Sequence, residues 1–271
     1  MNAASPFQGW NFVETSFGNT MSFSDRIKIL DSLSGSGLNV YRSFDGVSSG
    51  TVDRIYKAIG NYENEGYSVG FVMIDLYSGA SVSYGMDNYF YSASTFKGPY
   101  VMSLLKYKPW LLNSWGDTLY NTINVSSNEA YAELRNNLGA STLDWFVDWT
   151  HAWGFDYSSH YVWYTPRQLC KLWVGMADYL MGNEQDAWWA RDVYGNNIAI
   201  YSRQELAWKG VPIYAKSGWV NGSTNVHNEG YLVMDGDHPY VCVIMSNEIW
   251  QNNWKMRALM SAIDAAHGEL V

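Results

Sequence analysis

The sequence predicts an α/β (α+β) protein: an antiparallel five-stranded sheet flanked by N- and C-terminal helices, with an all-helical lobe inserted between its strands. Two observations carry this prediction. The residue patterns follow the order helix, two strands, a long helical stretch, three strands and a helix. Short turns at Ser78-Gly79 and Asn221-Gly222-Ser223 separate successive strands, and such turns join antiparallel neighbours. We expect a cleft between the lobes, where small-molecule sites tend to form.

Residues 1–50 carry the weakest pattern. A short helix is predicted over Ser22–Leu30 with Ser24 as its cap, and the flexible run Ser34–Gly37 follows it. We interpret residues 1–50 as an N-terminal extension that packs on the main body or links to an anchor. Residues 51–271 form the main domain.

The α/β lobe of this domain comprises residues 51–92 and 205–271. Its first helix is predicted over Thr51–Tyr62, because apolar residues recur there at helical spacing. Alternating and apolar runs predict the five strands: Ser68–Leu76, Ala80–Tyr84, Val211–Val220, Gly230–Met234 and Tyr240–Met245. The last helix contains Met256, Leu259, Met260 and Ile263.

The helical lobe comprises residues 93–204. Helices are predicted from about Ser94 to Lys106, over Asn128–Leu138 and over Ser141–Trp153. A further helix starts with Thr165 as its cap and Pro166 at its first position, a combination typical of helix starts.

The net charge of −9 argues against nucleic acid and anionic membranes as partners. No stretch is long and apolar enough to span a bilayer. No signal peptide is visible at Met1–Pro6, so either the protein is cytoplasmic or an export segment is absent from this chain.

The two cysteines, Cys170 and Cys242, lie in apolar settings that favour buried free thiols, although one disulfide stays open. The five histidines are scattered, and no pair has the spacing of metal ligands on a helix. We therefore expect no metal and no cofactor. Aromatic residues make up 17% of the chain. They suit a sugar- or wall-binding surface, but a place in the core is the favoured reading.

Ser94 and Lys97 stand three residues apart at a predicted helix start, so their side chains share one face. A serine hydroxyl becomes a strong nucleophile when a base takes its proton, and a lysine can do this when it is neutral. The pattern alone is weak, because Ser103 and Lys106 repeat it inside the same helix.

Two later motifs select the first pair. Ser126-Ser127-Asn128 lies in the helical lobe, and Lys216-Ser217-Gly218 lies on a late strand. A second Ser-x-Asn occurs at Ser223-Thr224-Asn225, so each motif alone is near chance. In this order and context, the three motifs resemble those of the serine β-lactamase and penicillin-binding-protein superfamily, closest to class A β-lactamases. The resemblance runs from about Thr51 to the C-terminus.

The resemblance implies four catalytic residues, which are Ser94, Lys97, Ser126 and Lys216. Ser94 attacks a carbonyl, and Lys97 is its base, with a pKa lowered by burial and by Lys216 across the cleft. Ser126 relays the proton to the leaving nitrogen.

It also implies residues that bind the substrate. Asn128 holds the substrate amide, and Lys216 and Ser217 suit a substrate carboxylate. Gly218 lets the substrate lie against the strand. By analogy with the family, the backbone N–H groups of Ser94 and Trp219 form the oxyanion hole.

The sequence departs from the class A pattern in three places. Ser127 stands where class A usually has aspartate. The loop Trp153–Tyr164, which precedes the Thr165 cap, lacks the glutamate that activates the deacylating water. Asp156 and His160 are the titratable substitutes there, with Asp156 a weak candidate base. No arginine follows the third motif, and we expect the nearby His227 to be a solvated loop residue.

These features predict a serine hydrolase that acts on β-lactams, D-Ala-D-Ala peptides or another amide or ester, with slow deacylation. A non-turnover sensor module is a second reading, and a wall- or glycan-binding protein is a third. The resemblance implies an extracytoplasmic, monomeric protein, with membrane contact only through an anchor outside this chain.

Overall fold

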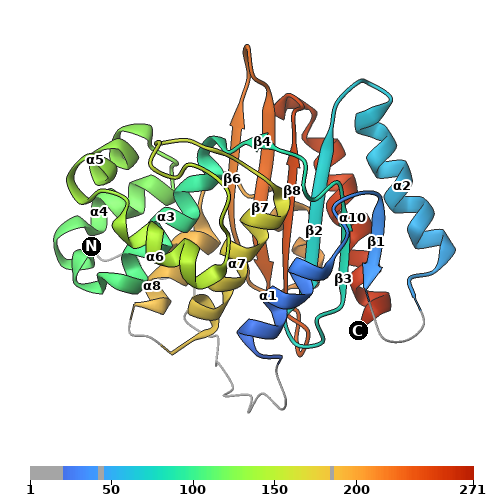
Figure 1. Ribbon diagram of the computed structural model, residues 1–271, viewed down its shortest axis with the longest axis horizontal. Coiled ribbons are helices and arrows are strands. Elements are labelled where there is room, and N and C mark those ends of the chain that lie inside the picture. Colours follow the sequence, from blue (N-terminus) through green and yellow to red (C-terminus); the bar gives the residue numbers. More distant parts are fainter. Residues whose placement is uncertain (1–20, 42–45, 184–185) are drawn as a thin grey trace.

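The computed structural model describes residues 21–41, 46–183 and 186–271. Within them, a twisted sheet with helices on both faces lies beside a helical lobe (Figure 1). This confirms the predicted fold class, including the inserted helical lobe.

The sheet has six strands in the order β1-β3-β2-β8-β7-β6, and every neighbouring pair is antiparallel. The strands are β1 (Leu38–Tyr41), β2 (Val69–Asp75), β3 (Ser81–Tyr84), β6 (Ile213–Val220), β7 (Val226–Val233) and β8 (Tyr240–Ser246). The prediction of five strands was wrong because it missed β1. This four-residue edge strand buries none of its side chains completely, so its residues give no alternation signal.

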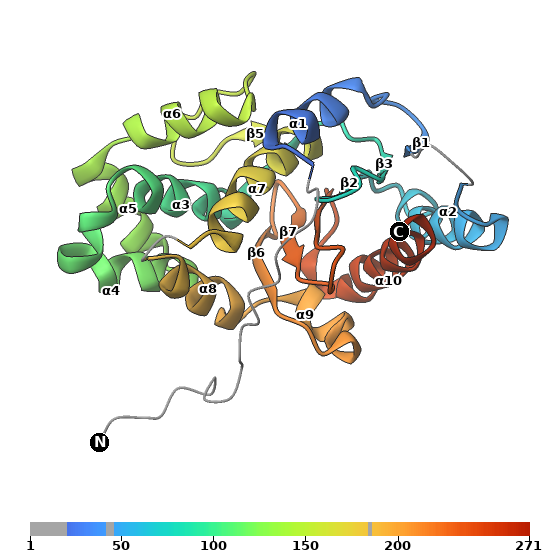
Figure 2. The same ribbon diagram turned by 90° about the horizontal axis from the view of Figure 1, so that it is seen from below.

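Each face of the sheet packs against its own helices, because successive side chains of a strand point to opposite faces. On β2, Phe71 and Met73 join the core beneath α2 (Ser49–Glu63) and α10 (Asn253–Leu270). Val72 and Ile74 join the larger core shared with α7 (Pro166–Met181) and the helical lobe. Figure 2 shows α2 and α10 on one side of the sheet, and α1 (Phe23–Ser32) and α7 on the other.

The described part of the N-terminal segment packs on the main body. The Arg26 side chain donates to the carbonyl of Leu76 at 2.7 Å, and Arg167 donates to the carbonyls of Leu30 and Leu33 near the end of α1. Of the two roles predicted for residues 1–50, packing on the body therefore holds for residues 21–41. Residues 1–20 lie outside the described residues, and the boundary at residue 50 stays a prediction.

The helical lobe contains α3 (Lys97–Tyr107), α4 (Leu112–Ile123), α5 (Asn128–Leu138), α6 (Ser141–Thr150) and α8 (Ala187–Asn196), with α7 between it and the sheet. The predicted cap of α7 is confirmed: Thr165 and Gln168 form a capping box, and Pro166 follows the cap. The helix predicted over Ser141–Trp153 ends at Thr150, because His151 adopts a left-handed conformation with φ of 54°.

Short elements complete the fold. They are β4 (Phe90–Tyr91), β5 (Trp163–Tyr164), α9 (Tyr201–Glu205) and four 3₁₀ turns: η1 (Ala93–Phe96), η2 (Pro109–Leu111), η3 (Ala207–Lys209) and η4 (Trp250–Asn252). Both cysteines are buried free thiols, as the sequence favoured. None of the described helices is long and apolar enough to cross a membrane.

Candidate active site

The predicted nucleophile lies on a strained turn between β4 and α3. Ala93 has φ of 45°, a conformation that is uncommon for a residue with a side chain. Ala93–Phe96 then form a 3₁₀ turn, and the α-helix begins at Lys97 rather than near Ser94. Because residues three apart eclipse one another in a 3₁₀ turn, Ser94 and Lys97 still share one side. Ser94 is partly exposed, and Lys97 is buried.

Strand β6 touches this turn at Gly218. A Cβ atom on Gly218 would lie 2.4 Å from the backbone nitrogen of Thr95 and 2.6 Å from that of Ser94. The glycine therefore permits direct contact between the strand and the nucleophile turn. The sequence analysis gave it another reason, the approach of substrate to the strand. The contact brings the Ser94 backbone N–H close to the segment that carries Trp219.

The Lys97 ammonium group is buried among uncharged oxygens. It donates to the Ser126 carbonyl at 2.6 Å, to Asn128 Oδ1 at 2.7 Å and to Ser126 Oγ at 3.4 Å. Burial lowers the pKa of Lys97 to about 8, against a smaller opposing effect of Glu129. These bonds connect Lys97 to the second motif. Among the described residues, no hydrogen bond joins the Lys97 ammonium group to the Ser94 hydroxyl.

Lys216 approaches the same serine from β6. Its ammonium group donates to Ser126 Oγ at 3.0 Å and to its neighbour's carbonyl, Ser217 O, at 2.8 Å. Burial, and then the positive charge of Lys97, lower the pKa of Lys216 to about 7, while Glu229 opposes the shift. The Ser126 hydroxyl thus lies between two amines, and its backbone has a left-handed φ of 56°. Such strain is common at functional sites.

The remaining members of the second motif have separate roles. Asn128 Oδ1 also accepts a hydrogen bond from the Tyr161 hydroxyl at 2.9 Å. Its side-chain amide nitrogen is the group left to contact a ligand. Ser127 is the N-cap of α5, and its hydroxyl accepts from Ala130 N at 3.1 Å. A capping role accounts for serine at this position.

Ser217 and Trp219 follow Lys216 on β6. The Ser217 hydroxyl is buried and donates to the Ala199 carbonyl, so its proton is not directed to an open position. Trp219 is partly exposed, and its ring centroid lies 5.9 Å from that of Trp250.

Strand β7 carries polar residues that the sequence analysis missed, because it placed the strand start at Gly230 instead of Val226. Glu229 is buried and accepts from the backbone N–H groups of Tyr201 and Ser202, each at 2.9 Å. Burial raises the pKa of Glu229 to about 7 despite these bonds. Every residue of β7 is buried, so the strand has no alternation of buried apolar and exposed polar residues that would predict it from the sequence.

His227 and Asn228 precede Glu229 on the strand. The prediction of a solvated loop histidine was wrong: His227 is buried in β7, its ring lies 4.7 Å from that of Tyr201, and burial lowers its pKa to about 4. Asn228 donates to the carbonyl of Tyr91 at 2.8 Å, which ties β7 to the chain just before the nucleophile turn.

Asp156 has a local structural role in the loop before α7. Its carboxylate accepts from the backbone and the hydroxyl of Ser158 at 3.0 and 2.5 Å, and these bonds lower its pKa. A carboxylate with a lowered pKa is a weaker base. The pKa of His160 is lowered by partial burial and by Arg135.

The competing Ser-x-x-Lys pair is structural. Ser103 is buried inside α3 and donates to the Tyr100 carbonyl at 2.7 Å. Lys106 lies over the ring of Trp149, 4.1 Å from its centroid. Neither side chain joins the second or third motif.

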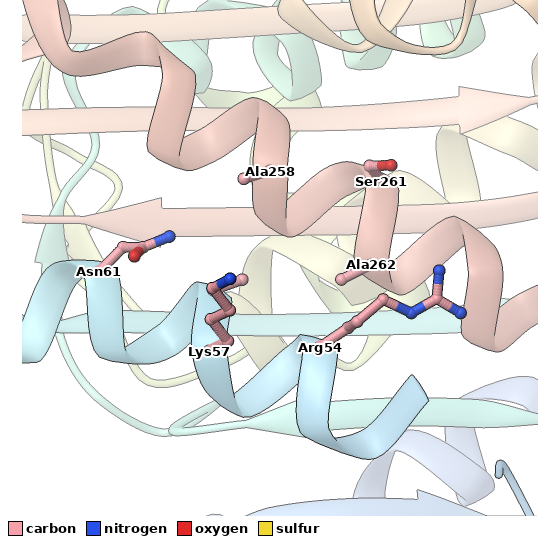
Figure 3. A pocket seen from close by; sticks show the side chains of 7 residues that line it. Arg54, Lys57, Asn61, Ala258, Ser261 and Ala262 are labelled. Atoms are coloured by element: carbon pink, nitrogen blue, oxygen red, sulfur yellow. The ribbon is translucent and has the colours of Figure 1, made fainter. Parts of the chain in front are cut away.

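Two other features lie apart from the motifs. Asp235, Asp264 and His267 bring three potential metal ligands together, but the Lys209 ammonium group lies 2.7 and 2.8 Å from the two carboxylates. A groove of about 180 Å³ lies between α2 and α10 (Figure 3). Arg54 and Lys57 are among its lining residues, and none of the residues that line it belongs to the three motifs.

Comparison with known proteins gives the family of this chain. The family model described as "Beta-lactamase enzyme family" matches residues 106–266. This range includes the second and third motifs and begins after Ser94 and Lys97. No curated protein matches the sequence.

Solved structures share the fold. A β-lactamase from Sphaerobacter thermophilus is 15% identical, with 80% of this chain and 97% of that chain covered and a TM-score of 0.65. A class A β-lactamase from Mycobacterium abscessus is 17% identical, with 80% and 99% covered and a TM-score of 0.63. A mutant of PBP-A in an acyl-enzyme complex with penicillin G is 16% identical, with 80% and 96% covered and a TM-score of 0.63.

At these identities the solved structures establish the fold, and the family model supplies the relationship in sequence. Its match covers more than half of the 271 residues. Together they confirm the predicted resemblance to the serine β-lactamase and penicillin-binding-protein superfamily. The protein therefore belongs to the beta-lactamase enzyme family.

Proposed function

We propose that this protein is a serine acyl-transfer hydrolase that forms an acyl-enzyme at Ser94 with β-lactams or D-Ala-D-Ala-type amides. The observation that carries the proposal is the position of Ser126 Oγ between the amines of Lys97 and Lys216. Burial holds the pKa values of both lysines near neutrality. A lysine becomes a useful base in this range, because a sizeable fraction is neutral.

In the proposed acylation, neutral Lys97 takes the proton of Ser94 as Oγ attacks the substrate carbonyl. The backbone N–H groups of Ser94 and Trp219 stabilise the oxyanion, and collapse of the intermediate breaks the carbon–nitrogen bond. Ser126 donates its proton to the leaving nitrogen and regains one from a neighbouring amine.

Lys216 binds the substrate carboxylate in this scheme. The carboxylate raises the pKa of Lys216 on binding, because an opposite charge nearby favours the charged form. The positive charge that Lys216 then carries opposes protonation of Lys97, because a like charge nearby disfavours the charged form. Asn128 contributes its amide N–H group to the substrate amide, and Ser217 and Gly218 shape the strand beside it.

Deacylation is slow in this proposal. The loop over residues 153–164 contains no glutamate, and the Asp156 carboxylate is engaged in its own turn. This observation favours a second candidate function, a penicillin-binding D,D-peptidase or a sensor module of the cell wall that is acylated without useful turnover.

We place the protein outside the cytoplasm, as a monomer that meets peptidoglycan-type peptides or β-lactam antibiotics. Membership of the beta-lactamase family supports this location. In the same proposal, residues 1–50 link the main domain to an anchor.

The proposal is tested by mass spectrometry of the intact protein with a fluorescent penicillin and a chromogenic cephalosporin, with Ser94→Ala as the control. An adduct on Ser94 that decays over minutes to hours is expected. Rapid colour release with no lasting adduct identifies an efficient β-lactamase. No adduct on a folded protein rules out the acyl-enzyme mechanism for β-lactams.

A further inference from the structure

A group of carboxylates and histidines lies at the end of β7 opposite to Asn228 and Glu229. Asp235 lies in the connection from β7 to β8, and Asp264 and His267 lie on α10. Because Asp264 and His267 are three residues apart, they project from one face of the helix. One ligand atom from each of these three residues lies within 4.8 Å of the other two. We call Asp235, Asp264 and His267 the three-ligand cluster.

The His267 ring turns an unpartnered nitrogen toward the cluster. Its Nε2 lies 3.0 Å from Asp75 Oδ2. An ionised carboxylate only accepts hydrogen bonds, so Nε2 donates, and Nδ1 of the neutral ring carries a lone pair. Nδ1 lies 3.9 Å from Asp235 Oδ2 and has no hydrogen-bond partner among the described residues, although the side chain is 1% exposed. A buried polar atom without a partner requires an explanation.

The surroundings of His267 match those of a metal-binding histidine. Such a histidine usually donates its other ring N–H to a carboxylate, and the buried Asp75 supplies that carboxylate here. The Tyr240 ring packs against the His267 ring with centroids 4.3 Å apart, and the Tyr240 hydroxyl donates to Asp264 Oδ1 at 2.8 Å. Both ligands on α10 are therefore held in place. The expectation of no metal rested on the histidines alone, whereas this pair includes an aspartate.

The charges of this group favour a further cation. The Lys209 ammonium group lies 2.7 Å from Asp235 Oδ2 and 2.8 Å from Asp264 Oδ1. Asp75 adds a third carboxylate, with His238 Nδ1 3.5 Å from it on the side of the β7–β8 connection. Three carboxylates against one ammonium ion leave two negative charges while the histidines are neutral. The ammonium group also marks where these oxygens accept a cation.

We propose that the three-ligand cluster binds a divalent transition-metal ion, with zinc as the best match. Zinc takes imidazole nitrogen and carboxylate oxygen ligands, and three protein ligands with one water complete a four-coordinate site. Ligand atoms of a tetrahedral zinc ion lie about 3.3 Å apart. A small rotation of the partly exposed Asp235 side chain brings its Oδ2 to this distance from His267 Nδ1.

The ion and the Lys209 ammonium group use the same two carboxylates, so zinc displaces the ammonium group from them. The bound ion joins the β7–β8 connection to α10 and stabilises the folded state, because it binds the folded chain only. The site contains no residue of the three motifs, so the inference does not depend on the proposed function.

Calorimetric titration of the chelator-treated 271-residue chain with zinc chloride tests the proposal. We expect one equivalent of zinc per chain and a higher melting temperature in its presence. His267→Gln removes the nitrogen ligand and abolishes this binding. Asp235→Asn changes a partly exposed residue outside the helices and strands, so it serves if His267→Gln melts early, and it also abolishes binding.

Lys209→Met gives the sharpest result. It removes the competing ammonium group, so we expect it to bind zinc about tenfold more tightly than the wild type, a typical size for coupling between two sites. His238→Gln is the matched control, because it removes the neighbouring histidine beside Asp75 and leaves the three-ligand cluster intact. Its affinity for zinc stays that of the wild type.

Three outcomes overturn the inference. If neither the wild type nor Lys209→Met binds one equivalent of zinc, a proton on His267 balances the carboxylates instead. If binding survives both His267→Gln and Asp235→Asn, the titration reports an adventitious ion only. If Lys209→Met binds zinc no more tightly than the wild type, the ion and the ammonium group do not share their ligands.

Discussion

Two pairs of lysines in this protein are held in opposite ways. At the candidate active site, Lys97 and Lys216 are 0% and 1% exposed, and their hydrogen bonds go to carbonyl, hydroxyl and amide oxygens. Elsewhere, Lys255 is also 1% exposed but lies 2.6 Å from both Glu65 and Glu248. Lys209 lies between two aspartates in the same manner.

The partners decide the protonation of each pair. Burial lowers the pKa of every one of these lysines, but carboxylate hydrogen bonds more than offset it at Lys255 and Lys209, whose pKa values are raised. Lys97 and Lys216 lack such bonds, and their pKa values fall. Burial without a carboxylate partner is therefore the feature that suits a lysine to act as a base.

The largest expected effect distinguishes the two lysine pairs: one pair determines the rate of acylation, and the other contributes to the free energy of unfolding. Lys97→Met lowers the rate of Ser94 adduct formation by about 10²- to 10⁴-fold, the contribution of a general base, while the protein stays folded. Lys255→Met leaves that rate nearly unchanged but lowers the free energy of unfolding by about 3 kcal/mol, because Glu248 is left buried without its partner.

Stopped-flow labelling with a fluorescent penicillin and urea unfolding measure the two quantities. A slow rate in both variants, or an unchanged rate in Lys97→Met, contradicts the division of roles.

The second prediction concerns the pH dependence of acylation. In the proposed mechanism neutral Lys97 is the base, and its pKa is about 8. At saturating penicillin, where the bound carboxylate keeps Lys216 charged, the rate of adduct formation therefore rises as the pH increases from about 6.5 and levels off above about 9. Pre-steady-state labelling across this range gives the profile. A flat profile, or one that falls through pH 8, excludes Lys97 as the titrating base.

The third prediction concerns the effect of the buried Lys216, which has no carboxylate partner, on the free energy of unfolding. Native Lys216 loses its proton near pH 7, whereas the unfolded chain holds it to about 10.5, so between these values the unfolded state binds more protons. The contribution of Lys216 to the free energy of unfolding therefore rises with pH over this window and is lowest below pH 7. Lys216→Met is more stable than wild type at pH 6, by about 1–4 kcal/mol.

The advantage of Lys216→Met diminishes toward pH 10. Urea unfolding at pH 6, 8 and 10 measures it, and Lys255→Met serves as the comparison because it is destabilised at pH 6. Equal stability of Lys216→Met and wild type at every pH would show that the lysine is not strained by burial.

The smallest expected effect concerns the hydrogen bond that positions the Asn128 side chain beside Lys97. Tyr161→Phe removes one hydrogen bond to Asn128 Oδ1 and lowers the rate of adduct formation by about 2- to 10-fold, with no change in the pH profile. Tyr89→Phe, at a residue that is 57% exposed, is the control. A rate loss of equal size in the control points to a general effect of the substitution.

Particular residues show how far the sequence could predict this site. The order of the three motifs selected Ser94 over Ser103 without any structure, and the Thr165 cap gave the start of α7 correctly. Gly218 was predicted to let the substrate lie against the strand. Its contact with the nucleophile turn was not predicted, because that contact joins residues 124 positions apart. Glu229 and Tyr161 were missed, since their importance comes from partners on α9 and α5.

The strand β1 was missed for a related reason. Its side chains are half-buried or exposed, so a burial pattern does not mark it, and its place comes from backbone pairing with β3. Backbone hydrogen bonds to a distant strand leave no trace in local composition.

The sequence by itself determined the fold class, the order of the lobes and the identity of the motif residues, because periodicity and turn chemistry are local properties of the chain. Only the tertiary structure decided which lysines are buried without a carboxylate, that Ser126 lies between two amines, and that the Tyr161 hydroxyl donates to Asn128. These properties depend on contacts between distant segments, and such contacts set burial, charge and pKa.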